Sequence, residues 1–445
     1  MLTTGVNAGV DNRSAFKGLW ADSVPLAGWS WQRKVAAIFL LSAAIQLLAG
    51  WLLFFRADVH LLDYDEQEYW TLSGQMLAGI PMELGRRTIL FPLVLTGLRS
   101  IWDNLWFVQC CVALGAAAAP PLLAVLVKKT TGSELAALIA GIAFACWPAQ
   151  IFYSSSLYSE TLALPVFLLS LVFMPRCFDG ARNTRWWQWA AVGATLGIAA
   201  HFRPMYQLFL PVLALILLLD SRRIGTSAAR FAMIAAGFAA VVLPWSVYVS
   251  RELGSPVLLS ANGGETLAGG FNPKIASIGE HTAQLAKRTT WYGPGKWMQA
   301  SDTGYLSAKE LSLPYVAQDR LLRARTLGWI SEDPATASYL ALRKFTYMWG
   351  IYPLRINGWR QLLFGNIPVI LLSLAFIWTL ISMPMVRRRC ARLYLLPLFV
   401  TGVGLISWGS WRFRLPGDAG IIGVVAILVA ARFNMWRQAP TEVGA

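Results

Sequence analysis

Long apolar runs separated by short polar connections extend over most of the chain. In hydrocarbon, every backbone N–H and C=O must be satisfied within the spanning element itself, and a helix needs about 20 apolar residues to cross. We therefore interpret these runs as transmembrane helices. The ten predicted spans are residues 35–55, 105–127, 134–153, 157–174, 186–200, 205–219, 228–249, 366–384, 393–408 and 419–431.

One further apolar stretch, residues 89–102, contains Pro92 and Arg99 and is too short to span comfortably. We interpret it as a juxtamembrane helix lying in the outer interface. If it were a span, Lys128 and Lys129 would lie on the outer side and the alternation of the later basic clusters would be inverted. The expected fold is an all-α polytopic membrane protein with about ten transmembrane helices, outer-face juxtamembrane helices and a small extracytoplasmic cap.

Lys and Arg gather at every second connection between the predicted spans. The clusters are Arg33/Lys34, Lys128/Lys129, Arg176/Arg182/Arg185, Arg222/Arg223/Arg230, Arg387/Arg388/Arg389/Arg392 and Arg432/Arg437. Short cytoplasmic loops carry such an excess of positive charge, so both termini are predicted to be cytoplasmic. The connections on the other side are residues 60–99, 154–156, 202–204, 250–365 and 409–418.

These assignments divide the chain into five parts. The segment after the seventh span bears Gly, Pro and charged residues, and we expect an ordered cap with short helices at 317–330 and 334–349. The parts are a cytoplasmic tail (1–34), a catalytic transmembrane module (35–249) with its first outer loop (57–103), an extracytoplasmic cap (250–365), C-terminal transmembrane helices (366–432) and a second cytoplasmic tail (433–445).

Composition narrows the function. Of the 445 residues, 56% are hydrophobic and 14% are charged, and the mean hydropathy is +0.51. Soluble domains are about 25% charged, so a soluble cytoplasmic enzyme is excluded. The net charge of +15 would favour a nucleic-acid partner only if the basic residues formed one solvated patch. They are dispersed between apolar runs, and we expect no nucleic-acid partner.

The first outward loop carries four carboxylates within six residues, Asp63, Asp65, Glu66 and Glu68, followed by Tyr69. A carboxylate held just outside hydrocarbon can serve as general base toward an acceptor hydroxyl, which contributes about 10²- to 10⁴-fold in rate. The alternative is a solvated loop in which Asp65 only caps the next helix. The loop by itself favours neither interpretation. A divalent metal ion is compatible with these carboxylates, and the sequence assigns no metal ligands.

Arginines lie between spans on the same predicted face. Arg203 occupies a very short connection near the bilayer edge, and Arg412 and Arg414 occupy another, with no evident acidic partner in their own segments. A guanidinium fork in such a position suits a lipid phosphate, and a phosphate shared by both connections explains them better than coincidence. Arg86 and Arg87 are a third candidate. The alternative for each is simple anchoring at the lipid head groups.

Two other polar residues complete the candidate set. Glu160 lies at a predicted outer helix start, where it can cap the helix, pair with the helix dipole or support a substrate-binding group. Asn262 lies in a glycine-rich turn where backbone N–H groups can approach a ligand closely, although tight turns are the commoner meaning of such runs. No phosphate-binding glycine motif is present, so cytosolic nucleotide chemistry has no support.

The order of several short motifs resembles that of the C-type (GT-C) membrane glycosyltransferases. The nearest branch is the bacterial family 39-like group, related to protein O-mannosyltransferases and lipid A aminoarabinose transferases. Each motif alone is weak, and their order and shared face make the combination specific. The motifs are residues 65–69, 87–92, 158–160, 202–204, 244–245, 260–264 and 412–416, within a resemblance that covers about 35–432.

The resemblance implies a polyprenyl-phosphate sugar as donor, transfer on the outer side and inversion at the anomeric carbon. Asp65 and Glu66 then match the acidic catalytic pair, and Asp65 deprotonates or orients the acceptor hydroxyl. The Glu-Lys-Pro-Pro segment of the aminoarabinose transferases is replaced here by residues 85–92, so their substrate is not implied. The residues assigned to substrate binding are Asp63, Tyr69, Arg86, Arg87, Glu160, Arg203, Asn262, Arg412 and Arg414.

The predicted function is therefore a membrane glycosyltransferase, a hexosyl or pentosyl transferase, that acts on a glycan, glycolipid or protein acceptor of the cell envelope. The expected location is the bacterial inner membrane, with a periplasmic active site. A lipid or glycolipid flippase is the alternative, but the sequence shows no internal repeat and its notable polar residues lie at the outer ends of spans. A scaffolding subunit is a third interpretation, in which the acidic loop is only solvated surface.

Overall fold

The protein is described by a computed structural model that places residues 28–52, 64–175, 184–221, 224–273, 275, 306–350, 366–382 and 390–438. These ranges form helices joined by turns and irregular segments, and they contain no β-strand. The predicted all-α polytopic membrane fold is confirmed. Asp63, one of the predicted substrate-binding residues, lies outside the described residues.

Each predicted span coincides with one helix or with two consecutive helices. In order they are α2 (Trp31–Gly50), α5 (Leu105–Ala116) with α6 (Ala119–Thr131), α7 (Glu134–Ala145) with α8 (Pro148–Ser154), α9 (Ser159–Phe173), α10 (Trp186–Phe202), η2 (Pro204–Phe209) with α11 (Leu210–Ser221), α12 (Ile224–Glu252), α20 (Ile367–Ser382), α22 (Ala391–Ile406) and α23 (Leu415–Gln438).

Length separates these helices into two groups. In the described part of the chain, four stretches are long and apolar enough to cross a membrane, and α7 and α8, bent by 53°, make a fifth if they count as one span. The other predicted spans are shorter helices within the same bundle. The four long stretches are Trp31–Gly50, Leu105–Thr131, Ile224–Glu252 and Trp411–Phe433.

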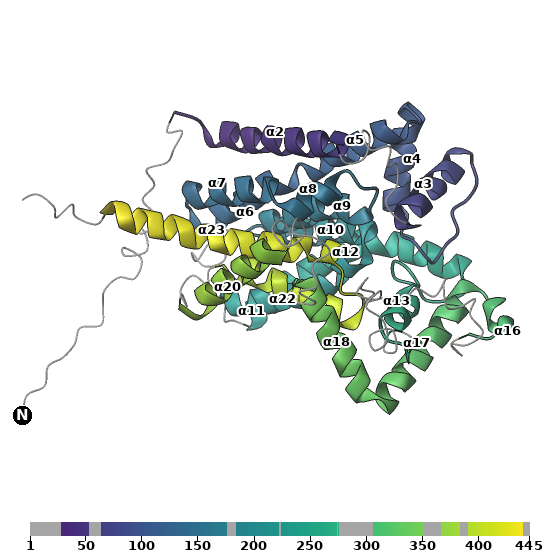
Figure 1. Ribbon diagram of the computed structural model, residues 1–445. Coiled ribbons are helices and arrows are strands. Elements are labelled where there is room, and N and C mark those ends of the chain that lie inside the picture. Colours follow the sequence, from purple (N-terminus) through teal and green to yellow (C-terminus); the bar gives the residue numbers. More distant parts are fainter. Residues whose placement is uncertain are drawn as a thin grey trace, which may run out of the picture.

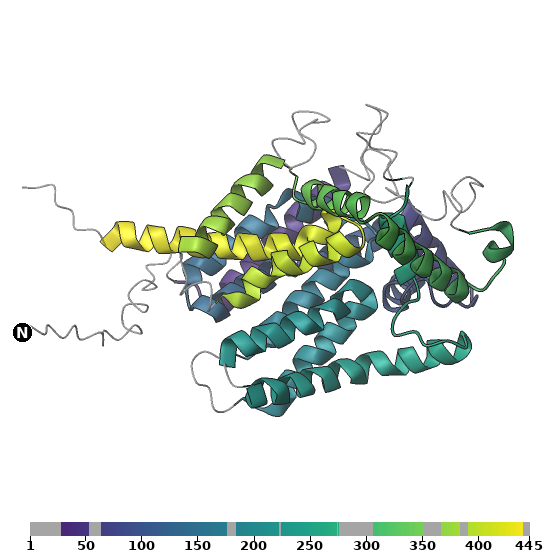
Figure 2. The same cartoon turned by 90° about the horizontal axis from the view of Figure 1, so that it is seen from below.

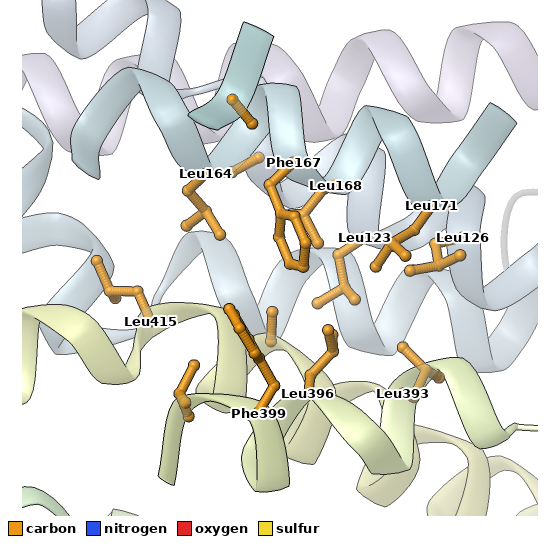
Figure 3. Close-up of a cluster of buried hydrophobic side chains, with 14 of the residues drawn as sticks. Leu123, Leu126, Leu164, Phe167, Leu168, Leu171, Leu393, Leu396, Phe399 and Leu415 are labelled. Carbon is orange, nitrogen blue, oxygen red and sulfur yellow. The ribbon is translucent and has the colours of Figure 1, made fainter. Parts of the chain in front are cut away.

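The core lies where α6, α9, α22 and α23 meet, as Figure 3 shows for a cluster of buried leucine and phenylalanine side chains. Phe167 of α9 lies opposite Phe399 of α22, with ring centroids 6.2 Å apart. Protein covers most of α9, because ten of its fifteen residues are buried. The exposed and partly exposed residues lie along one stripe of the helix, which includes Leu162, Val166, Leu169 and Phe173. The helix therefore serves as a fixed support for whatever its first turn carries.

Two glycines let α10 and α12 cross in direct backbone contact (Figure 2). A Cβ atom on Gly193 would lie 1.8 Å from the carbonyl oxygen of Ile234, and one on Gly237 would lie 2.0 Å from that of Ala190. Small residues at a crossing permit this close approach in membranes, where van der Waals packing replaces the hydrophobic effect between helices. The contact holds α10 against α12, and Arg203 follows the end of α10.

The helices outside the predicted spans gather at one end of the bundle (Figure 1). They include α4, which occupies the stretch predicted as a juxtamembrane helix, and α17 and α18, which occupy the positions expected for helices of the cap. The helices at this end are α3 (Tyr64–Leu77), α4 (Leu90–Ile101), α13 (Gly263–Gly270), α16 (Ala308–Leu311), α17 (Tyr315–Glu332) and α18 (Pro334–Met348).

Basic residues lie at the opposite end of the bundle. Glu134, at the start of α7, pairs with Lys34 of α2 at 2.7 Å and with Lys128 of α6 at 2.5 Å. Arg392 of α22 donates to the carbonyl oxygen of Met174, just beyond the end of α9, at 3.0 Å. Three of the predicted basic clusters therefore share one end of the bundle, one helix length away from the first turn of α9.

Candidate functional site

Eight charged side chains alternate in sign along one continuous series of contacts at the end of the bundle that carries α3 and α13. We call this series the ion-pair chain. Within it, Asp65 of α3 and Arg412 of η5 (Trp411–Arg414) hydrogen-bond to each other directly. In order, its members are Glu265, Arg86, Glu68, Arg87, Asp65, Arg412, Glu160 and Arg203.

Local breaks in the helices place three of these groups. Asp65 lies in the first turn of α3. Arg203 ends α10 in an extended conformation because Pro204 follows it and disfavours the helical region for the preceding residue. Arg412 lies in the single turn of η5 between α22 and α23. The three residues come from distant parts of the sequence, and each belongs to an end of a helix rather than to its middle.

Arg412 is held more firmly than the other cations of the chain. Its side chain is 4% exposed, and its guanidinium lies 4.5 Å from the ring centroid of Tyr158, 4.9 Å from that of Trp408 and 5.0 Å from that of Phe413. Arginine stacks favourably on such faces. Its Nε lies 3.3 Å from Glu160 while its Nη2 contacts Asp65, so one buried guanidinium fixes two carboxylates.

A turn before α4 brings two more arginines to the carboxylates of α3. Gly85 adopts φ +100°, a conformation that other residues rarely adopt, and its carbonyl oxygen accepts a hydrogen bond from Ala261. Arg87 then donates to Asp65 at 2.6 Å and to Glu68 at 2.6 Å. Arg86 lies 3.4 Å from Glu68.

The arginines control the charge of Asp65. Burial alone would raise the pKa of this carboxyl group, but the fields of Arg412, Arg87 and Arg203 and the hydrogen bond from Arg412 outweigh burial and hold the pKa well below its usual range. Asp65 is therefore ionised throughout the physiological range. A carboxylate held by these arginines can orient a hydroxyl group by accepting its hydrogen bond. Its pKa rises when one of the cations is neutralised.

The structure changes the interpretation of two predicted residues. Glu66 is fully buried, and its carboxylate accepts a hydrogen bond from the backbone N–H of Leu157 at 2.7 Å, which anchors α3 to the start of α9. Arg414 does have an acidic partner in its own segment, contrary to the expectation, because its Nε donates to Asp418 at 2.8 Å. Arg414 also donates to the carbonyl of Met348 and thereby ties η5 to α18.

Two further candidates lie beside the ion-pair chain rather than in it. The ring of Tyr69 lies 5.0 Å from the Arg87 guanidinium, and its hydroxyl donates to Ser159 at 3.3 Å. Tyr69 therefore packs against the ion-pair chain and links it to the first turn of α9. Asn262 precedes α13 and accepts a hydrogen bond from Ser260. Its helix contributes Glu265 to the ion-pair chain, and Glu265 lies 3.5 Å from Arg86.

Sequence reasoning missed the roles of Glu68 and Glu265. Glu68 lies one turn after Asp65 on α3, a spacing of three residues that puts both carboxylates on one helix face. This signal was available in the sequence. Glu265 meets Arg86 because the segment before α13 packs against the turn at Gly85, and no local sequence pattern predicts this contact. Among the described residues, no group of three or more His, Cys, Asp or Glu side chains could hold a metal ion.

The sequence matches no protein-family model and no curated protein. Solved structures do match. The archaeal oligosaccharyltransferase AglB from Archaeoglobus fulgidus, solved with an inhibitory peptide and a dolichol-phosphate, aligns over 94% of this chain and 53% of its own, with a TM-score of 0.50 and 12% identity. The chain has the GT-C membrane fold. It spans about half the length of the archaeal enzyme.

Two other solved structures align with this chain at lower TM-scores. An Archaeoglobus fulgidus oligosaccharyltransferase in complex with zinc and sulfate gives a TM-score of 0.48 at 13% identity, over 91% of this chain and 51% of that one. ArnT from Cupriavidus metallidurans, bound to undecaprenyl phosphate, gives 0.42 at 14% identity, over 92% of this chain and 79% of that one.

Proposed function

We propose that this protein is an integral membrane glycosyltransferase. It moves a sugar from a polyprenyl-phosphate donor to a hydroxyl group of an envelope acceptor on the extracytoplasmic face, with inversion at the anomeric carbon. The observation that carries the proposal is the ion-pair chain, in which an ionised carboxylate and several guanidinium groups meet at one end of a membrane bundle. The fold shared with an archaeal oligosaccharyltransferase supports it.

The chemistry needs few components. A lipid phosphate leaves readily when cations neutralise the charge that develops on it, and pre-positioned arginines do this without a nucleotide or a cytosolic energy source. The acceptor hydroxyl requires alignment and a base, and we assign the role of base to Asp65. Glu66, buried against Leu157, is assigned a structural role instead. Arg203 is the group that we assign to the phosphate.

Sidedness supports an outward-facing site. Lys34, Lys128 and Arg392 lie at the end of the bundle opposite to the ion-pair chain. Short loops on the cytoplasmic side carry an excess of positive charge, so we assign the ion-pair chain to the extracytoplasmic side. The membrane that we propose is a bacterial inner membrane. The dolichol-phosphate in the AglB structure supports a lipid-phosphate donor. The inhibitory peptide in the same structure keeps a protein among the proposed acceptors, beside a glycan or glycolipid. The transferred sugar is a hexose or a pentose.

The proposal predicts a missing sugar. In a strain that lacks the gene, mass spectrometry of envelope glycans and glycolipids should show one acceptor lighter by the mass of a single sugar, and the wild-type gene should restore it. This result follows because the acceptor is made but not modified. Glycans and glycolipids that are unchanged in mass would contradict the transferase. A lighter acceptor, with the lipid-linked sugar accumulating on the cytoplasmic side of the membrane, would favour the flippase.

A further inference from the structure

Arg203 ends the ion-pair chain, and this position distinguishes it from the other arginines. In the described part of the structure it forms one ion pair, with Glu160 at 3.2 Å, whereas Arg87 and Arg412 each contact two carboxylates. The Arg203 side chain is 17% exposed, against 4% for Arg412. A ligand arriving from outside therefore reaches Arg203 with less displacement than it would reach Arg412.

The contact between Arg203 and Glu160 is loose for a buried pair. Glu160 Oε1 is buried, and within the described structure it lies 3.2 Å from Arg203 and 3.3 Å from Arg412, yet accepts a hydrogen bond from neither. Charge-assisted N–H···O bonds are typically about 2.7–2.9 Å long. The second oxygen of Glu160 accepts a hydrogen bond from Ser159 at 3.2 Å, which holds the carboxylate in place.

Releasing Arg203 costs less than releasing Arg412, the other cation beside Glu160. If Arg203 moved to a phosphate, Glu160 would keep Arg412 as its partner. If Arg412 moved instead, Asp65 and Glu160 would both lose a buried cation, and an uncompensated buried charge is strongly destabilising. The exchange therefore takes place at the end of the chain.

We propose that Glu160 is a positioning residue that holds Arg203 while no donor is bound, and that the donor's phosphate displaces it from Arg203. This inference rests on the proposed function. The exchange breaks one ion pair and forms another, and the phosphate adds its own negative charge to a series of contacts in which four carboxylates otherwise match four guanidinium groups. Glu160 thus competes with the phosphate for Arg203, and it acts on the reaction through its neighbours rather than by touching the reacting atoms.

The exchange prepares Asp65 for its role as base. Arg203 is one of the cations that lower the pKa of Asp65, and a phosphate bound to Arg203 cancels that field, so the pKa of Asp65 rises when the donor binds. Glu160, left with Arg412 alone, also draws this guanidinium away from Asp65. Donor binding and base strength are therefore coupled, and such coupling acts in both directions.

The test measures binding and turnover separately, because removing the competitor should affect them in opposite directions. In lipid nanodiscs, Glu160→Gln should bind a long-chain polyprenyl phosphate about tenfold more tightly than wild type, equivalent to about 1.4 kcal/mol. Its kcat should fall about tenfold, since Arg412 then remains on Asp65. A purely structural defect would weaken binding and turnover together. The phosphate-free polyprenol measures the contribution of the lipid tail.

Two further variants keep the test decisive. Glu160→Asp retains the charge but retreats by one methylene, so it should tighten binding by a smaller factor even if the Gln variant does not fold. Glu310→Gln removes a carboxylate that pairs with Arg325 in the cap and should change neither value. Binding to Glu160→Gln that equals or falls below that of wild type overturns the inference. Wild-type protein that does not prefer the phosphate to the polyprenol overturns the proposed function as well.

Discussion

Asp65→Asn should lower the rate of sugar transfer by about 10²- to 10⁴-fold, the usual contribution of a general base. The protein should still fold, because each arginine that contacts Asp65 has a second carboxylate. Arg87 keeps Glu68 at 2.6 Å, and Arg412 keeps Glu160 at 3.3 Å. The measurement is single-turnover transfer from a polyprenyl-phosphate sugar by purified protein, with size-exclusion chromatography to confirm folding.

Asp103→Asn is the matched control for this change. Asp103 lies just beyond α4, is 51% exposed and pairs with Arg99 four residues earlier, so the same substitution there should leave the rate unchanged. If Asp65→Asn retains a rate near that of wild type, Asp65 is not the base. A loss of rate in both variants would mean that the assay reports general damage at this end of the bundle.

Arg412→Gln should abolish transfer and also lower the free energy of unfolding by roughly 3–5 kcal/mol, as expected when one partner of a buried ion pair is removed. Arg412 neutralises Asp65 and Glu160 together and fills the space between Tyr158, Trp408 and Phe413. Glutamine supplies neither the charge nor the planar fork. Thermal unfolding of the detergent-purified protein, followed by tryptophan fluorescence, gives the stability change.

Arg325→Gln provides the comparison for stability. Arg325 is 38% exposed and pairs with Glu310 in the cap, and exposed pairs contribute little to stability. Equal unfolding temperatures for Arg412→Gln and wild type would show that the buried guanidinium is not what holds α3, α9 and η5 together.

The sequence was enough to predict the all-α polytopic membrane fold and the helices of its bundle. Hydrocarbon forces backbone groups to bond within a helix, so an apolar run near the required length has one outcome. Arg203 and Arg412 stood out for the same reason, since each charged group lies between two apolar runs where an unpaired guanidinium is costly. Both effects act on a short segment of the chain, so they can be predicted from the composition and the position of that segment.

The pairing of charges could not be predicted in the same way. Arg87 and Glu68 are 19 residues apart, and Arg412 and Asp65 are 347 residues apart, so their contacts depend on how α3, α4 and η5 pack. Arg414 is instructive because its partner, Asp418, is only four residues away on the same helical path. That spacing was visible in the sequence and should have removed Arg414 from the phosphate-binding candidates.

The position of a bound lipid phosphate tests the central claim most directly. A cryo-electron microscopy structure of the protein in nanodiscs, with a long-chain polyprenyl phosphate added, should place the phosphate within hydrogen-bond distance of Arg203, with Glu160 released from Arg203 and Asp65 facing the same space. A phosphate bound at the opposite end of the bundle, beside Lys34 and Lys128, would contradict the account.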